Sequence, residues 1–120
     1  MVKFYARHPN MHRTPLSIGL IGTSWWADSM YLPALAAHPR AAVAALCGRD
    51  RGRAERLAKR WDVARVYTDY RQMMRTGDLD AVVIASANDS HHPATMAALE
   101  RGLHVLCEKP LALSVAEAAE

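Results

Sequence analysis

The stretch that decides the fold is "LDAVVIASANDSHHPATMAALERGLHVLC", residues 79–107. It opens with a mostly apolar run over 79–86 and closes with a second one over 103–107. Between them, residues 92–102 have the pattern of a helix, with a proline in its first turn and a glycine as C-cap. Apolar runs without polar alternation are typical of strands that are covered on both faces. The stretch therefore predicts two parallel strands joined by a crossover helix.

The same alternation of strand and helix extends outward in the N-terminal direction and continues to residue 120. Further strands are predicted over 16–22, 41–47 and 64–68, and further helices over 24–38, 51–61, 69–76 and 114–120. Pro33 is expected to kink the helix over 24–38 or to split it in two. Five repetitions of this alternation predict an α/β fold, a doubly wound parallel sheet with the strand order 3-2-1-4-5.

Length and composition fit one globular domain. The chain has 120 residues, of which 51% are apolar and 22% charged. No apolar run approaches the roughly 18 residues that span a bilayer, and the start has no apolar core of a secretory signal. Residues 1–15 are interpreted as an N-terminal extension and 16–120 as the domain. We expect a cytoplasmic protein with no membrane partner.

The net charge of +3 raises nucleic acid as a partner, but much of the excess lies within residues 48–60. A basic helix without interleaved aromatic residues is usually a solvated face, so no nucleic-acid binding is predicted.

The cysteines and histidines give no metal signature. Cys47 and Cys107 are each expected to end a strand, three strand spacings apart, which at about 4.8 Å per spacing amounts to about 14 Å. A disulfide needs Cα atoms within about 7 Å, so both should be free thiols. The neighbouring residues His91 and His92 diverge in regular structure, and no metal site is predicted.

The first predicted strand leads into the turn "GTSWWA", residues 22–27. The dinucleotide fingerprint G-x-G-x-x-G/A fits at Gly22 and Ala27, whereas Ser24 replaces the middle glycine. The Ser24 hydroxyl could donate a hydrogen bond to a phosphate, and backbone amides up to Trp26 would meet it at the helix start. The candidate cofactor-binding residues here are Gly22, Thr23, Ser24, Trp25, Trp26 and Ala27. A turn of small residues between any strand and helix looks similar, and that alternative stays open.

The end of the second strand, "LCGRD", concerns the adenosine ribose. A carboxylate at this point accepts hydrogen bonds from the ribose hydroxyls and disfavours NADP. Gly48 carries no charge there, while Arg49 and Arg53 offer guanidinium groups suited to a phosphate. NADP is therefore favoured over NAD. Two alternatives remain: Asp50 could serve as the ribose acceptor instead of a helix N-cap, or the arginines could simply face water.

The fourth and fifth strands end on the same rim. After the fourth, Asn88 can hydrogen-bond a ribose or the following backbone, and His91 is a further candidate, although a structural place near the helix start fits it better. After the fifth, Lys109 would arrive beside the reactive end of the cofactor, with Glu108 as its partner. Pro110 would fix the direction in which the chain leaves. Lys109 and Glu108 are the candidate catalytic residues.

Together these segments resemble the Gfo/Idh/MocA oxidoreductases, the family of glucose–fructose oxidoreductase and inositol dehydrogenase. The resemblance covers about residues 16–120 and is most specific in N-x-x-H followed by an Ala-Leu helix and E-K-P. It implies a Rossmann fold and an NAD(P)-dependent oxidoreductase that transfers hydride to or from a sugar- or polyol-like substrate. It also implies that Lys109 lies near the nicotinamide ribose and the substrate oxygen, often before a cis proline. Ser24 and Ala87 depart from the family pattern.

The resemblance further implies parts that these 120 residues lack: a sixth strand and a C-terminal α/β substrate domain with the general acid/base and the oligomer interface. The chain alone is then catalytically incomplete, and the full-length enzyme is expected to form a homo-oligomer. An exposed edge at the fifth strand should favour self-association or low stability. The alternative is a stand-alone NADPH-binding sensor or interaction module without catalysis.

Overall fold

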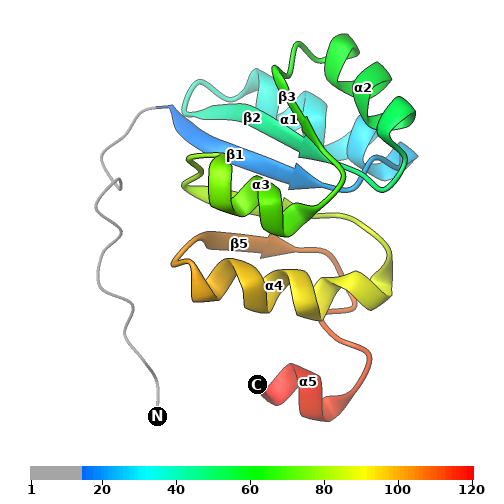
Figure 1. The fold of residues 1–120 in the computed structure, drawn as a ribbon, viewed down its shortest axis with the longest axis vertical. Helices are drawn as coiled ribbons and strands as arrows, with labels where there is room; N and C mark the ends of the chain where they lie inside the picture. Colours follow the sequence, from blue (N-terminus) through cyan, green and yellow to red (C-terminus); the bar gives the residue numbers. More distant parts are fainter. Residues whose placement is uncertain (1–14) are drawn as a thin grey trace.

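The computed structural model describes residues 15–120, which form a five-stranded parallel sheet in the order β3-β2-β1-β4-β5 (Figure 1). The strands are β1 (Leu16–Ile21), β2 (Ala41–Cys47), β3 (Arg65–Tyr67), β4 (Ala81–Ile84) and β5 (His104–Cys107). Every adjacent pair is parallel. The predicted doubly wound sheet and its strand order are confirmed. The predicted N-terminal extension over residues 1–15 lies almost entirely outside the described residues.

Helices follow each strand, as the alternation predicted. They are α1 (Leu32–Ala37), α2 (Arg51–Arg60), α3 (Tyr70–Thr76), α4 (His91–Glu100) and α5 (Val115–Ala119), with a π-helical turn η1 (Ala27–Tyr31) before α1 and a 3₁₀ turn η2 (Asn88–Ser90) before α4. Side-chain caps begin three of them, since Asp50, Asp69 and Ser114 accept hydrogen bonds from backbone N–H groups of α2, α3 and α5. Such caps satisfy donors that the first helical turn leaves without a partner.

Two apolar layers hold the helices on opposite faces of the sheet. One contains Met73 and Met74 of α3 and Ala94 and Ala98 of α4, packed on inner residues of the central strands. The other contains Leu32 of α1 and Leu57 and Ala58 of α2. Figure 1 shows α3 and α4 in front of the sheet. The β1 strand lies at the centre of the sheet, and five of its six residues are buried.

Pro33 does interrupt the predicted helix over 24–38, but the irregular part precedes the proline. The N–H of Leu32 donates to the carbonyl of Ala27, five residues back, which is π-helical spacing. Proline has no N–H to donate to the carbonyl four residues before it, so the chain makes a wider turn there. The result is one continuous helical segment rather than two separate helices.

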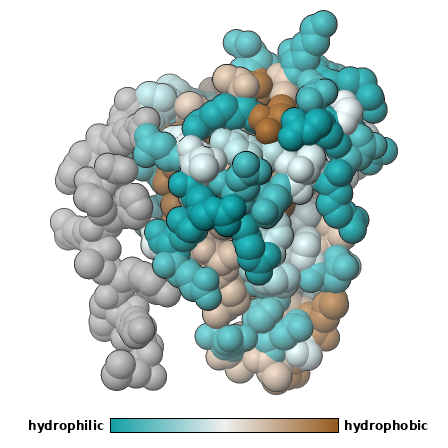
Figure 2. Space-filling view, viewed as in Figure 1, coloured by the Kyte–Doolittle hydropathy of each residue, from teal (hydrophilic) through white to brown (hydrophobic). Residues whose placement is uncertain are grey.

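The β5 strand departs from the expectation of a strand covered on both faces. His104 and Leu106 are two residues apart, point to the same face of this edge strand and are exposed. Exposed apolar side chains extend from β5 to the start of α5. They are Leu106 (54% exposed), Leu111, Leu113 and Val115. Figure 2 shows apolar surface at the lower end of the molecule, where α5 lies. The predicted exposed edge is confirmed.

No helix within the described range is long and apolar enough to cross a membrane. Residues 15–120 also hold no group of three or more His, Cys, Asp or Glu side chains arranged to bind a metal ion. Cys47 and Cys107 are both free thiols. Burial raises the pKa of the Cys47 thiol to about 12, with the Asp69 charge adding to the effect, so this thiol is neutral at physiological pH.

Candidate cofactor site

The carboxyl ends of β1, β2 and β3 surround a cavity of about 290 Å³. Its lining includes Gly22, Thr23 and Ser24 after β1, Gly48, Arg49, Asp50 and Arg53 after β2, and Thr68 and Tyr70 after β3. This edge of the sheet lies at the right in Figure 1, where the strand arrows end. Six of the residues predicted to bind cofactor thus come together in one place.

A second cavity of about 240 Å³ continues the rim toward β4 and β5. It is lined by Ser24, Trp26, Ala85, Ser86, Asn88, His91, Glu108 and Lys109. The two cavities have Ser24, Ala85 and Ser86 in common, so they form one continuous rim. The predicted convergence of the loops after strands one, two, four and five is therefore present in the structure.

Gly22 makes the tight turn that brings the first loop onto this rim. Its φ of +121° lies in a region that L side chains rarely adopt. A Cβ at this position would lie 2.4 Å from the carbonyl oxygen of Ala85. The Gly22 N–H donates to the carbonyl of Cys47 at 2.9 Å, which ties the turn to the end of β2.

The helix that follows begins at Trp25, directly after Ser24, and its N-terminus lies at the rim. The N–H of Asp28 donates to the Ser24 carbonyl at 3.1 Å, and the N–H of Ala27 reaches the Ser24 hydroxyl at 3.5 Å. The N–H groups of Trp25 and Trp26 precede the first intrahelical bond, so they belong to the donors that a helix leaves for caps or anions. The Ser24 hydroxyl keeps its own proton available for a further bond.

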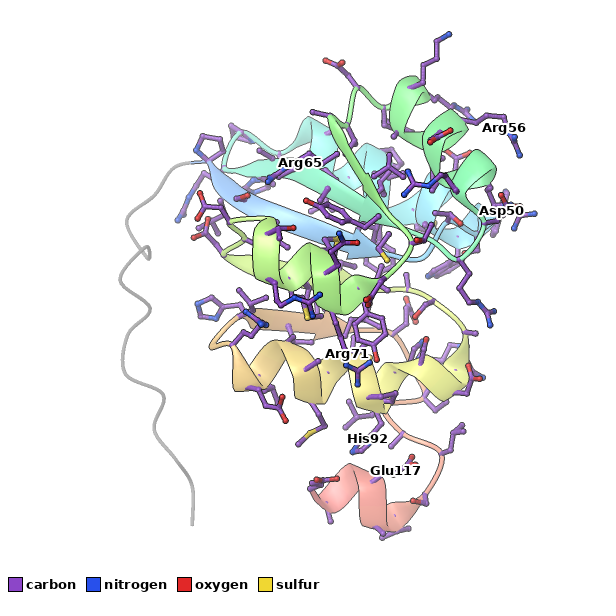
Figure 3. The ribbon with its side chains drawn as sticks, viewed as in Figure 1. Asp50, Arg56, Arg65, Arg71, His92 and Glu117 are labelled. Carbon is purple, nitrogen blue, oxygen red and sulfur yellow. The ribbon has the colours of Figure 1, made fainter. Side chains whose placement is uncertain are left out.

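The structure settles how Asp50 is used. Its carboxylate accepts a hydrogen bond from the N–H of Arg53 at 3.0 Å and caps α2 (Figure 3). That bond is the main reason why the pKa of Asp50 lies below its usual range. The interpretation of Asp50 as an N-cap is confirmed. Arg49 and Arg53 are exposed at the mouth of the first cavity.

Glu108 has other partners than the one expected. Its Oε1 accepts hydrogen bonds from Tyr31 Oη at 2.6 Å and from Trp26 Nε1 at 2.8 Å. These two bonds, that of Tyr31 first, hold the pKa of the Glu108 carboxyl below its usual range. Burial, followed by the Glu108 bond, raises the pKa of Tyr31 to about 12. Glu108 thus joins the end of β5 to the first helix.

The expected partnership of Glu108 with Lys109 takes a weaker form than a salt bridge: the charge of the Lys109 ammonium helps to lower the pKa of the Glu108 carboxyl, after the larger effects of the Tyr31 and Trp26 hydrogen bonds. Within residues 15–120, Lys109 contacts the carboxylate through its backbone N–H, which donates to Oε2 at 3.1 Å. The Lys109 side chain is exposed and lines the second cavity. Because Glu108 is held by the helix, the ammonium is left to face the cavity.

His91 is structural in the way that its position near the helix start suggested. It is 1% exposed, with Nδ1 2.7 Å from the Pro110 carbonyl oxygen and Nε2 3.1 Å from the Ser86 carbonyl oxygen. The side chain therefore bridges the loops that leave β4 and β5. The bond between Lys109 and Pro110 is cis.

The residues present fit a dinucleotide. A cradle at Gly22 that a Cβ would fill, free helix N-terminal amides and two arginines suit a pyrophosphate and a further anionic group. Sequence comparison agrees with this geometry. A family described as "Oxidoreductase family, NAD-binding Rossmann fold" matches residues 16–120. The chain belongs to this Gfo/Idh/MocA family.

Several known proteins are similar to the chain. D-xylose 1-dehydrogenase (NADP(+)) 2 of Haloferax volcanii is 38% identical over 104 residues, which are 87% of this chain and 32% of that protein. The scyllo-inositol dehydrogenase of Lactobacillus casei with NAD(H) and scyllo-inositol has a TM-score of 0.82 at 26% identity, over 89% and 31% of the two chains. A 3-ketoreductase of Actinomadura kijaniata with TDP-benzene and NADP has a TM-score of 0.80 at 34% identity, over 88% and 33%.

The chain therefore spans about a third of the length of these relatives. The fold is that of an NAD(P)-binding Rossmann domain, and both NAD and NADP occur among the structural neighbours. The relatives named here do not favour one cofactor over the other.

Two of the predicted cofactor residues do not reach the main cavities. Ala27 is fully buried. This suits the third position of the fingerprint, where a small residue lets the helix pack closely on the strand. Trp25 is 71% exposed and lines an open groove with Arg56 and Arg60 of α2, and this groove shares Thr23, Ser24 and Arg53 with the first cavity. Neither position contradicts the fingerprint, because Gly22, Thr23 and Ser24 make the turn and line the first cavity.

Sequence reasoning missed Tyr31 and Ser86. Tyr31 lies five residues after Trp26, and five-residue spacing brings side chains onto one face in a π-helical turn but not in an α-helix. The proline at 33 was the available signal for that irregularity. Ser86 contributes through its carbonyl, which any residue type could supply, so no sequence pattern marks it.

Proposed function

We propose that the chain is the cofactor-binding part of an NAD(P)-dependent oxidoreductase that transfers hydride between the nicotinamide and a sugar- or polyol-like alcohol or ketone. The observation that carries this proposal is the common rim: the Gly22 turn and the Lys109 side chain line two cavities that share Ser24, Ala85 and Ser86. The relatives named above as xylose and inositol dehydrogenases support the substrate class.

In this proposal the Lys109 ammonium is the catalytic residue of the chain. It donates a hydrogen bond to the substrate oxygen and stabilises negative charge that develops there. Glu108 acts as a positioning residue, because its bonds to Tyr31 and Trp26 fix the end of β5. Asn88, exposed at the second cavity, offers an amide to the ribose. The cofactor supplies the hydride chemistry.

We assign NADP as the favoured cofactor. The strand end at Gly48 carries no carboxylate, and Asp50 is engaged as the cap of α2. Arg49 and Arg53 stand at the mouth of the cavity, where a planar guanidinium suits a 2′-phosphate. The general acid/base and the homo-oligomer stay predictions from the family resemblance, and the cytoplasmic location stays a prediction from the sequence.

Isothermal titration calorimetry of the chain with NADPH and with NADH tests the proposal. The wild-type chain should bind NADPH more tightly. Arg49→Ala should weaken NADPH binding about tenfold or more, since hydrogen bonds to charged groups contribute roughly 1.5–3 kcal/mol, and should change NADH binding about twofold at most. Arg75→Ala, at the end of α3, is the matched control.

A wild-type preference for NADH of about tenfold would reject the cofactor assignment. Absence of binding by either nucleotide would reject the oxidoreductase itself. The stand-alone sensor is distinguished by a test of the full coding sequence: NADP-dependent oxidation of xylose or inositol that is lost in Lys109→Ala supports the enzyme.

A further inference from the structure

Gly48 is a glycine for a reason that lies in a neighbouring side chain. Among the residues described, the glycines with positive φ are Gly22 and Gly102, so the backbone of Gly48 is one that any L residue can adopt. A Cβ at position 48 would nevertheless lie 2.6 Å from Cγ2 and 2.8 Å from Oγ1 of Thr23. Real Cβ atoms do not approach other atoms so closely. The Thr23 side chain therefore occupies the space into which a side chain at 48 would extend.

We propose that Thr23 is a specificity-determining residue of the cofactor site, because it keeps the end of β2 free of the carboxylate that an NAD site uses. This inference rests on the proposed function and deepens it. Cofactor preference is then set by Thr23 and Gly48 as a pair, and not by the residue at 48 alone.

Neither residue can easily move aside. The buried Gly48 donates its N–H to the Tyr67 carbonyl at 3.0 Å, which holds it against β3. On the other side, the N–H of Gly22 donates to Cys47, and a Cβ at Gly22 would contact Ala85, so the turn before Thr23 is fixed between β2 and β4. Threonine has heavy atoms at two of its three staggered positions, so only one rotamer would turn a hydrogen toward position 48.

The consequence concerns the ribose end of the cavity. A carboxylate at the end of the second strand binds the ribose hydroxyls and repels a 2′-phosphate. Thr23 excludes that group, and Asp50 is engaged in capping α2. Arg49 and Arg53 are then the charged side chains of this cavity that remain free to bind a ligand there.

The test is a double-mutant cycle with NADPH and NADH as probes, read by calorimetry. Gly48→Asp alone should weaken the binding of both cofactors, because its Cβ collides with Thr23 and displaces the turn over residues 22–24. Thr23→Ala leaves its Cβ 3.3 Å from the new side chain, a contact that a small shift relieves. The double variant should bind NADH at least about tenfold more tightly than Gly48→Asp, a coupling of about 1.4 kcal/mol. Thr23→Val with Gly48→Asp keeps the volume and should behave like Gly48→Asp.

Urea unfolding of Gly48→Ala, with and without Thr23→Ala, measures the contact independently of cofactor. The single variant should unfold at lower urea, and the second substitution should restore most of the midpoint. If Gly48→Asp folds only together with Thr23→Ala, that also supports the inference. The inference is overturned if Gly48→Asp alone binds NADH as tightly as the double variant. A wild-type chain that binds neither nucleotide overturns the proposed function as well.

Discussion

Two adjacent histidines show how strongly the fold differentiates residues of one type. His91 is buried and faces two backbone carbonyls, those of Ser86 and Pro110. His92 points from α4 toward α5, where Nε2 lies 3.0 Å from Glu120 Oε2 (Figure 3). A neutral imidazole has one N–H, so it donates to one of two such carbonyls at a time. At this scale His91 positions the Lys109 loop and His92 does not.

His91→Leu should destabilise the chain by about 1 kcal/mol, because the loops that leave β4 and β5 lose a part-buried hydrogen bond. His92→Leu should change stability by less than about 0.5 kcal/mol, as expected for a surface contact such as that with Glu120. The measurement is the free energy of unfolding in urea for each variant. Equal effects of the two substitutions would show that His91 does not hold the loop.

At the scale of the elements, sequence and structure agree where local residue patterns determine the secondary structure. The apolar runs predicted all five strands, and the chirality of parallel crossovers left few ways to arrange them. The π-helical turn at Ala27–Tyr31 was less predictable, since proline marks an irregularity without specifying its form. The β5 strand reads as apolar in sequence, but its burial depends on a neighbour that the strand itself does not specify.

The cap of α3 is a prediction that belongs to this scale. Asp69 accepts a hydrogen bond from the N–H of Arg71 at 2.8 Å, and α3 covers the sheet with Met73 and Met74. Asp69→Ala should lower the free energy of unfolding by about 1 kcal/mol. Asp69→Asn keeps an acceptor oxygen and should lose much less. Thermal unfolding of both variants checks this, and an alanine variant as stable as the asparagine variant would contradict the capping role.

For the whole molecule, the site was predictable to the extent that topology alone determines it. Parallel strands with this order bring their carboxyl ends to one rim, so Gly22, Gly48 and Lys109 could be grouped from sequence. The partners of Glu108 could not, because Tyr31 and Glu108 are 77 residues apart and meet only through the packed fold. The close approach of Thr23 to Gly48 could not be predicted from the sequence for the same reason.

The exposed edge leads to a prediction about association. Exposed apolar side chains beside an unpaired strand edge favour contacts between molecules. The chain should therefore exceed its monomer mass of 13.3 kDa in sedimentation equilibrium at about 100 µM. Leu106→Lys combined with Leu113→Lys should restore the monomer, whereas Met30→Lys, an exposed apolar residue elsewhere, should not. A wild-type chain that stays monomeric would contradict the prediction.

The most direct test of the central claim is a titration of the ¹⁵N-labelled chain with NADPH, followed by backbone amide chemical shifts. The claim is that the loops after β1, β2 and β5 bind one pyridine nucleotide together. It predicts that Gly22–Ala27, Gly48, Arg49 and Lys109 shift with a single dissociation constant. Shifts confined to the outer face of α2, around Arg56 and Arg60, or loops that titrate independently, would contradict it.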